Sequence, residues 1–153
     1  MSVLIFDIIK FVKKSLLATT FYTLVGAFIV IISMFFVPVV RELFTGPFLF
    51  LSPLILFSIL GGVLLFLTIK SKLKGKQRKL LILTGASAAG FFISILLHNL
   101  LYALGIVFGH IVILKYLFEF LHATFFIVAV VICPLGFVFG AIGTIAVLIK
   151  KSV

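Results

Sequence analysis

Four long stretches of this chain carry no charged side chain, and this feature restricts the fold more than any other. The stretches are 15–40, 43–69, 80–114 and 120–149. A helix that spans a bilayer needs about 20 mainly apolar residues, so each stretch is long enough for one span. Because backbone polar groups in lipid must be satisfied within the segment, we expect these spans to be helices. The sequence therefore predicts an all-α, polytopic membrane protein with four transmembrane helices.

Composition excludes a soluble domain. The chain has 153 residues, of which 65% are hydrophobic and 10% are charged, against about 45–50% and about 25% in soluble proteins. A core of this size cannot hide so much apolar surface from water. We predict one transmembrane domain over 1–153. Its parts are an amphipathic start at 1–14, spans at about 16–37, 48–69, 80–103 and 124–149, a basic loop at 70–79, and an outer amphipathic segment at 109–122.

The distribution of the net charge of +10 predicts the orientation. The segment KSKLKGKQRK, residues 70–79, holds six basic residues and no acid. Further lysines lie near both ends of the chain, and the other two connections are nearly balanced in charge. Positive charge favours the cytoplasmic side in short loops, so we expect both termini and this loop to be cytoplasmic, in the cell membrane.

The basic loop also predicts a partner. Lysine and arginine near a membrane surface attract anionic lipid headgroups. We therefore expect headgroup contacts, and no nucleic-acid partner, since short basic tracts of this kind are generic. The residues concerned are Lys70, Lys72, Lys74, Lys76, Arg78 and Lys79.

Small and polar residues form a stripe in each of the last two predicted spans. Spacings of three and four keep such residues on one side of a helix, and small residues are favoured where helices meet in lipid. We predict that the third and fourth spans pack along these stripes, with one stripe at a contact between copies as the alternative. Pro134 is expected to kink the fourth span. The packing residues are Ser87, Gly90, Ser94 and Gly105 in one stripe, and Cys133, Gly136, Gly140 and Gly143 in the other.

The connection over 109–122 is too apolar for an ordinary loop. Lys115, Glu119 and His122 fall on one face of a helix. This pattern favours an amphipathic helix on the outer surface. The alternative is that the segment extends both neighbouring helices beyond the membrane.

The three histidines, His98, His110 and His122, map to the outer third of the molecule. Glu119 and His122 form E-x-x-H, which di-iron bundles use twice with further glutamates. With only three acids, one chain cannot supply such a site. His98, Glu119 and His122 suit one zinc or iron ion, and His98 with His122 suits a haem.

We favour a simpler interpretation of these residues, with no cofactor. In that interpretation His98 donates a hydrogen bond to Ser94, Tyr102 or a backbone carbonyl across the helix seam. Glu119 then pairs with Lys115.

Other chemistry finds little support in the sequence. Asp7 is the only aspartate and is expected on the cytoplasmic side, far from the histidines. A proton-coupled exporter would be expected to place a carboxylate deep in the membrane, and the predicted spans contain none. We predict a non-enzymatic structural or accessory subunit that contacts lipid, itself or a larger membrane complex. The alternatives are a metal-binding or haem-binding protein, and a small channel or transporter whose path is lined by the stripe from Ser87 to Tyr102.

Three segments carry a resemblance over mainly the C-terminal half. LTGASAAGF, LLHNLLYALG and VICPLGFVFGAIG, with the terminal Lys150-Lys151, together resemble a group of small prokaryotic four-helix integral membrane proteins of unassigned function. The resemblance implies a prokaryotic cytoplasmic membrane. It implies no activity and no functional residues.

Overall fold

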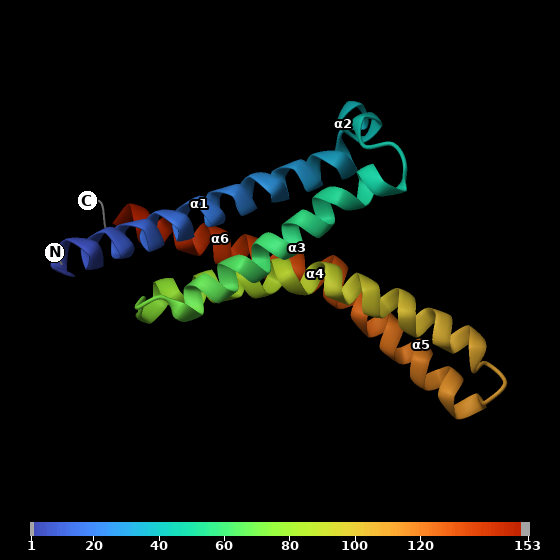
Figure 1. Ribbon diagram of the computed structural model, residues 1–153. Coiled ribbons are helices and arrows are strands. Elements are labelled where there is room, and N and C mark those ends of the chain that lie inside the picture. Colours follow the sequence, from blue (N-terminus) through green and yellow to red (C-terminus); the bar gives the residue numbers. More distant parts are fainter. Residues whose placement is uncertain (1, 151–153) are drawn as a thin grey trace.

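The computed structural model describes residues 2–150, and side chains from Ser15 to Lys150. All regular structure in this range is helical (Figure 1). Four segments are long and apolar enough to cross a membrane: Ser15–Phe36, Pro47–Lys70, Gly75–Val107 and Val112–Lys150. The predicted all-α fold is confirmed, and the four helices are compatible with a multi-pass membrane protein. The elements are α1 (Ser2–Phe36), α2 (Pro38–Leu43), α3 (Pro47–Lys70), α4 (Gly75–Val107), α5 (Val112–Ile127), the π turn η1 (Val128–Ile132) and α6 (Cys133–Lys150).

Proline and glycine set the helix boundaries between the first two spans. Val37 is extended, with φ −110° and ψ 110°, as expected for a residue before proline. Pro38 and Pro47 occupy first-turn positions of α2 and α3, where a missing N–H costs nothing. Gly46 takes φ +93° between them, a conformation that a side chain would make unfavourable.

The basic loop is shorter than its sequence suggests. α3 ends at Lys70 and α4 begins at Gly75, so only 71–74 connect the two helices. The remaining basic residues lie in the first turns of α4, because lysine, arginine and glutamine are good helix formers. The predicted amphipathic character of 1–14 and the position of Lys151 fall outside the described side chains.

The segment predicted as an outer surface helix is instead part of a long helical hairpin. α4 continues to Val107, the chain turns over 108–111, and α5 then packs antiparallel to α4. The 39 residues Val112–Lys150 would extend about 58 Å at 1.5 Å per residue, against a hydrocarbon core of about 30 Å. Whether the hairpin lies at the membrane surface or extends beyond the membrane stays a prediction.

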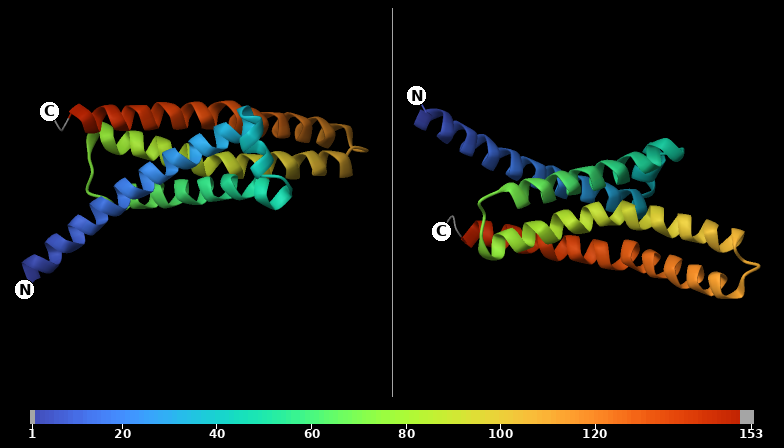
Figure 2. Two further views of the ribbon diagram at one scale, coloured as in Figure 1. Left: turned by 90° about the horizontal axis from the view of Figure 1, so that it is seen from above. Right: turned by 60° about the horizontal axis from the view of Figure 1, so that its bottom comes forward.

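The molecule has one basic end and one divided end. The start of α1, the α3–α4 turn and the end of α6 all lie toward the basic end (Figure 1), with the start of α1 set apart from the other two (Figure 2). At the divided end, the arm formed by α1, α2 and α3 separates from the arm formed by α4 and α5 (Figure 1). Figure 2 shows that α1 crosses the other helices obliquely. α4 lies centrally and packs against α3, α5 and α6.

Aromatic rings attach α1 to the rest of the bundle. The ring of Phe28 lies 4.5 Å from that of Phe137 on α6 and 5.8 Å from that of Phe57 on α3. Phe57 and Phe137 are 5.1 Å apart in an edge-on arrangement, a geometry that aromatic pairs prefer. These contacts fix the middle of α1, although the helix shares no small-residue seam with α6.

The fourth span contains the π turn η1, which ends two residues before Pro134. Proline has no N–H and its ring clashes with the carbonyl four residues back, here that of Val130. The chain responds with a wider turn, in which the Cys133 N–H bonds the Val128 carbonyl. The predicted effect of Pro134 is therefore present as a single π turn, which is a recognised cause of helix bending.

Candidate functional site

The seam between α4 and α6 is built on glycine. A Cβ added to Gly140 would lie 2.5 Å from Thr84 Oγ1 and 2.8 Å from the Thr84 nitrogen. One added to Gly136 would lie 2.5 Å from Ser87 Oγ, and one on Gly143 would lie 2.7 Å from a methyl group of Leu80. The structure thus brings Ser87, Gly136, Gly140 and Gly143 together within one chain.

The small-residue stripe of α4 continues toward the end of that helix, where it faces first the start of α6 and then α5. A Cβ on Gly90 would lie 3.5 Å from Cys133 Sγ, and one on Gly105 would lie 3.4 Å from Phe118 Cβ. Ser94, between them, is buried. Within the stripe proposed as a channel lining, Ser87 lies against Gly136 of α6 and Ser94 is buried, whereas Tyr102 is exposed.

Sequence reasoning missed a second close contact, between α3 and α4. A Cβ on Gly61 would lie 2.6 Å from both Ala88 Cβ and the Ala89 nitrogen. The Ser58 hydroxyl donates a 2.8 Å hydrogen bond to the Ala89 carbonyl. A Cβ on Gly85 would lie 2.9 Å from the Leu65 nitrogen. The sequence signal for this contact was the run of small residues GASAAG in α4. These residues present small side chains on two faces of α4, which packs against both α3 and α6.

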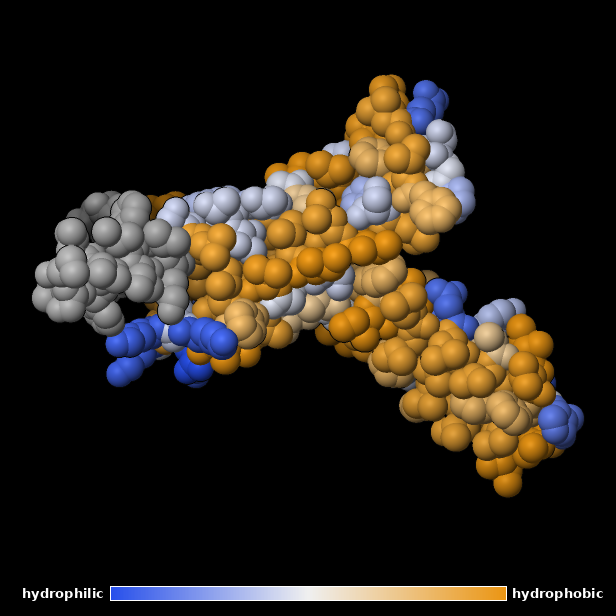
Figure 3. Space-filling view, in the orientation of Figure 1, coloured by the Kyte–Doolittle hydropathy of each residue, from blue (hydrophilic) through white to orange (hydrophobic). Residues whose placement is uncertain are grey.

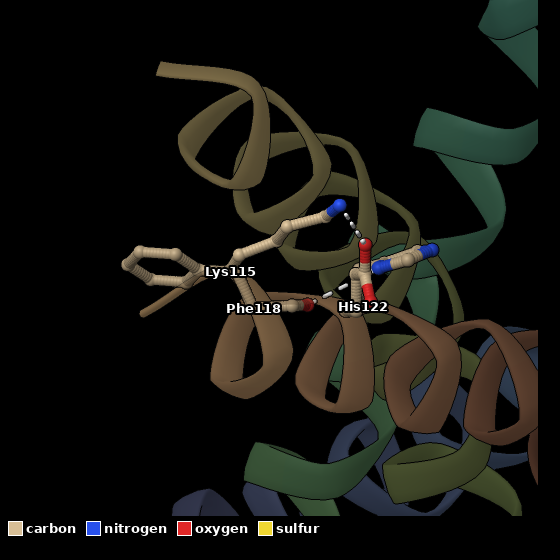
Figure 4. A network of polar contacts seen from close by, with 4 residues as sticks. Lys115, Phe118 and His122 are labelled. Carbon is tan, nitrogen blue, oxygen red and sulfur yellow. Dashed lines mark hydrogen bonds and ion pairs between the residues drawn. The ribbon is translucent and has the colours of Figure 1, made fainter. Parts of the chain in front are cut away.

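His98 and His122 meet where α4 and α5 run side by side. His98 Nδ1 lies 2.8 Å from the His122 carbonyl oxygen. His122 Nδ1 lies 3.1 Å from the Phe118 carbonyl oxygen (Figure 4). A carbonyl only accepts, so Nδ1 of each imidazole carries the proton. In the neutral rings, Nε2 of each is left with its lone pair.

The two imidazoles border one open hollow of about 350 Å³, lined also by Ala123, Phe126 and Ile127. Their ring centroids are 5.3 Å apart with an interplanar angle of 46°. Phe126 lies 5.3 Å from the His98 ring and Tyr102 lies edge-on to His122 at 5.6 Å. These aromatic neighbours restrict the rotation of both imidazoles.

Glu119 does not join the two histidines. Its carboxylate lies 3.9 Å from Lys115 Nζ, one turn earlier on α5, and both side chains are about half exposed. Within residues 15–150, no three His, Cys, Asp or Glu side chains converge as metal ligands would. His110 is exposed in the turn between α4 and α5. The three-residue set His98, Glu119 and His122 is thus not assembled as predicted, because Glu119 has the nearer cation.

Both contacts expected in the simpler sequence interpretation are present. His98 bonds a backbone carbonyl across the seam, and Glu119 pairs with Lys115. A haem held by both histidines would have to lie between their rings, where the bond from His98 to the His122 backbone now closes the gap. That alternative remains a prediction that requires α4 and α5 to separate.

The basic end collects the charged side chains of the α3–α4 turn, visible as a group of hydrophilic residues in Figure 3. Lys70 ends α3 and its Nζ lies 4.3 Å from the centre of the Phe66 ring. Lys76, Arg78 and Lys79 lie at the start of α4, which has no acidic residue in its first turn. The helix dipole favours anions at this position. The helix dipole therefore does not favour the cations at this position, although their intrinsic helix propensity does.

An apolar recess lies where the two arms divide, between α1 and the helices α3, α4 and α6. Its volume is about 360 Å³, and Figure 3 shows apolar surface on both sides of the division. The recess is lined by Phe28, Ile31, Ile32, Phe35, Phe36, Phe57, Phe91, Val130, Cys133 and Pro134.

No protein-family model, curated protein or solved structure matches this chain. The resemblance to small prokaryotic membrane proteins therefore stays a prediction, and the function must be argued from the recess, the seams and the histidine pair.

Proposed function

We propose that this chain is a non-enzymatic structural or accessory membrane protein that self-associates, with the apolar recess receiving part of a second copy. The observation that carries this proposal is the recess itself, a hollow of about 360 Å³ lined by apolar side chains of several helices. Its position at the division of the arms gives a second molecule room to enter.

The recess is a better docking surface for a second copy than the helix seams are. Gly136 and Gly140 already lie against Ser87 and Thr84 of the same chain, so these stripes have no room for another copy. Helices associate in lipid through van der Waals packing. The side chains that line the recess make no van der Waals contact with other atoms of the described part of the chain on its open side. A helix surface of matching shape from a second copy would fill the recess and supply these van der Waals contacts.

The shape of the protein suits a two-fold arrangement. Two molecules with divided ends can interlock so that an arm of each enters the division of the other. Such a contact uses the same surface on both copies and closes without further growth. Phe36 is 77% exposed and Phe35 is 51% exposed at the edge of the recess, where they would pack on the incoming arm.

We also assign the basic end to the cytoplasmic side of a cell membrane. The support is the concentration of lysine and arginine there, together with the fact that the α1 start, the α3–α4 turn and the α6 end point to the same end of the molecule (Figure 1). Anionic headgroups are the partners that would compensate the cations of early α4. Neither an enzymatic activity nor a nucleic-acid partner belongs to this proposal.

A steric-block experiment tests self-association. In a Cys133→Ala background, Ile32→Cys places a thiol in the recess, and Ile59→Cys places one on the outward face of α3, where Ile59 is 59% exposed. Both are reconstituted in liposomes with and without a bulky maleimide, and dimer formation is followed by energy transfer over a range of protein-to-lipid ratios. We expect a dimer that labelling at Ile32→Cys abolishes and labelling at Ile59→Cys leaves intact. A wild type that is monomeric at every ratio, or a dimer that survives labelling at Ile32→Cys, would overturn the proposal.

A further inference from the structure

The geometry points to a two-histidine metal site at His98 of α4 and His122 of α5, able to hold a divalent transition-metal ion such as zinc. This site is independent of the recess and of self-association. It differs from the three-ligand set expected from the sequence, because Glu119 takes no part in it.

The hydrogen bonds of the two rings prepare them as ligands. Histidines that bind metals almost always donate their other ring N–H to a carboxylate or a backbone carbonyl, which fixes the tautomer and the ring orientation. Here both rings do so, His98 to the His122 carbonyl and His122 to the Phe118 carbonyl. Each Nε2 therefore presents its lone pair without any rearrangement of protons.

The separation of the rings suits a shared ion. Two imidazoles bound through nitrogen to one tetrahedral metal, at about 2.0–2.1 Å each, have ring centres about 5 Å apart. The observed distance between the His98 and His122 centroids is 5.3 Å. Both rings also border the same open hollow, which gives water access to the remaining coordination positions.

The supporting residues hold both rings in place. His122 is tied to its own helix through Phe118, and His98 is tied across the seam to α5. Phe126 and Tyr102 lie against the rings from α5 and α4. A site whose ligands are already oriented in this way loses little entropy on binding. A bound ion would also join α4 to α5 near the divided end.

Imidazole nitrogen selects the class of metal. Zinc, copper and nickel suit imidazole ligands, whereas magnesium and calcium prefer oxygen. Two protein ligands and open positions for water describe an accessible site, unlike the closed four-ligand sites of structural zinc. We therefore expect reversible binding of one zinc ion per chain, with cobalt(II) as a coloured substitute whose absorption reports nitrogen coordination.

The test separates the ligand role of each histidine from its hydrogen bond. In His98→Asn and His122→Asn, the amide nitrogen takes about the place of Nδ1 and keeps a donor for the carbonyl, while the Nε2 ligand is lost. His110→Ala is the matched control, because His110 lies on the same hairpin outside the pair. Each purified variant is titrated with zinc in mild detergent, and the measurements are metal content, cobalt absorption and the metal-dependent rise in melting temperature.

We expect one zinc per chain in the wild type and in His110→Ala, with binding about 100-fold weaker or absent in either asparagine variant. Circular dichroism should show that the asparagine variants remain helical, so that the loss is one of binding. Two results would overturn the inference. One is zinc binding that is the same in the wild type and the His98→Asn/His122→Asn double variant. The other is loss of binding in His110→Ala.

Discussion

Gly140 and Thr84 are in backbone contact across the α4–α6 seam: a Cβ on the glycine would lie 2.8 Å from the Thr84 nitrogen and 3.1 Å from the Leu80 oxygen. Neither atom can move without displacing helix α4. We therefore expect Gly140→Ala to destabilise the protein by about 1–3 kcal/mol, the usual cost of overpacking. Reversible unfolding in mixed micelles measures this change.

Gly26 provides the comparison for this substitution. A Cβ at Gly26 would meet nothing within 4 Å, and alanine is a better helix former than glycine by about 0.8–1.0 kcal/mol. Gly26→Ala should therefore be neutral or stabilising under the same conditions. Equal effects of the two substitutions would contradict the seam described above.

The neighbouring glycines of α3 give an internally matched prediction. A Cβ on Gly61 would lie 2.6 Å from the Ala89 nitrogen, whereas one on Gly62 would meet nothing within 4 Å. Gly61→Ala should cost about 1–3 kcal/mol by forcing α3 away from α4. Gly62→Ala should cost nothing. Thermal denaturation of both variants in one detergent checks the prediction, and a larger loss at Gly62 would place the α3–α4 contact elsewhere.

The π turn can be removed without changing the helices on either side. η1 accommodates one residue more than an α turn, so deleting Val131 with Pro134→Ala should leave a regular helix whose flanking contacts keep their register. We expect both seams to remain and the melting temperature to stay within about 4 °C of the wild type, which corresponds to about 1 kcal/mol.

Deleting Phe139 is the control, because Phe139 is also exposed but lies in regular helix between Gly136 and Gly140. One residue removed there rotates the following residues by about 100°. Gly140 would leave Thr84, and the protein should lose most of its stability. Similar melting temperatures for the two deletions would show that η1 is not a simple insertion.

Thiol labelling in intact bacteria tests the proposed orientation. Thr45→Cys lies in the connection before α3 and Lys74→Cys lies in the connection before α4, and both positions are exposed. In a Cys133→Ala background, a membrane-impermeant maleimide should modify Thr45→Cys and leave Lys74→Cys unmodified until the cells are opened. The reverse pattern would place the basic end outside and refute the assignment.

Periodicity made the architecture and one seam predictable. Charge-free stretches indicate spans directly, since bilayer thickness fixes the length of helix required. The spacing of Ser87 and of Gly136 and Gly140 placed them on stripes that the structure brings together. The α3–α4 seam could not be derived in this way, because Gly61 and Gly85 are paired by the rotation of each helix about its axis, which local spacing does not determine.

The contacts of the histidines were likewise only partly predictable from sequence spacing. Sequence spacing put His98 on the α4 stripe and Glu119 on one face with His122. It could not show that His98 bonds the backbone of residue 122, since that contact depends on how far α4 extends and where the hairpin turns. The spacing of four residues between Lys115 and Glu119 did favour their pairing, and the structure contains that pair.

The divided end has a consequence for the membrane itself. The α1–α3 arm and the α4–α5 arm lie apart at one end of the molecule (Figure 1). If the proposed orientation places that end within the outer leaflet, the protein has a larger cross-section in that leaflet than in the other. Lipids must redistribute around such a wedge, and many copies in one patch would relieve the difference in lateral pressure by bending the bilayer. The angle between the arms would then set the curvature that this protein prefers.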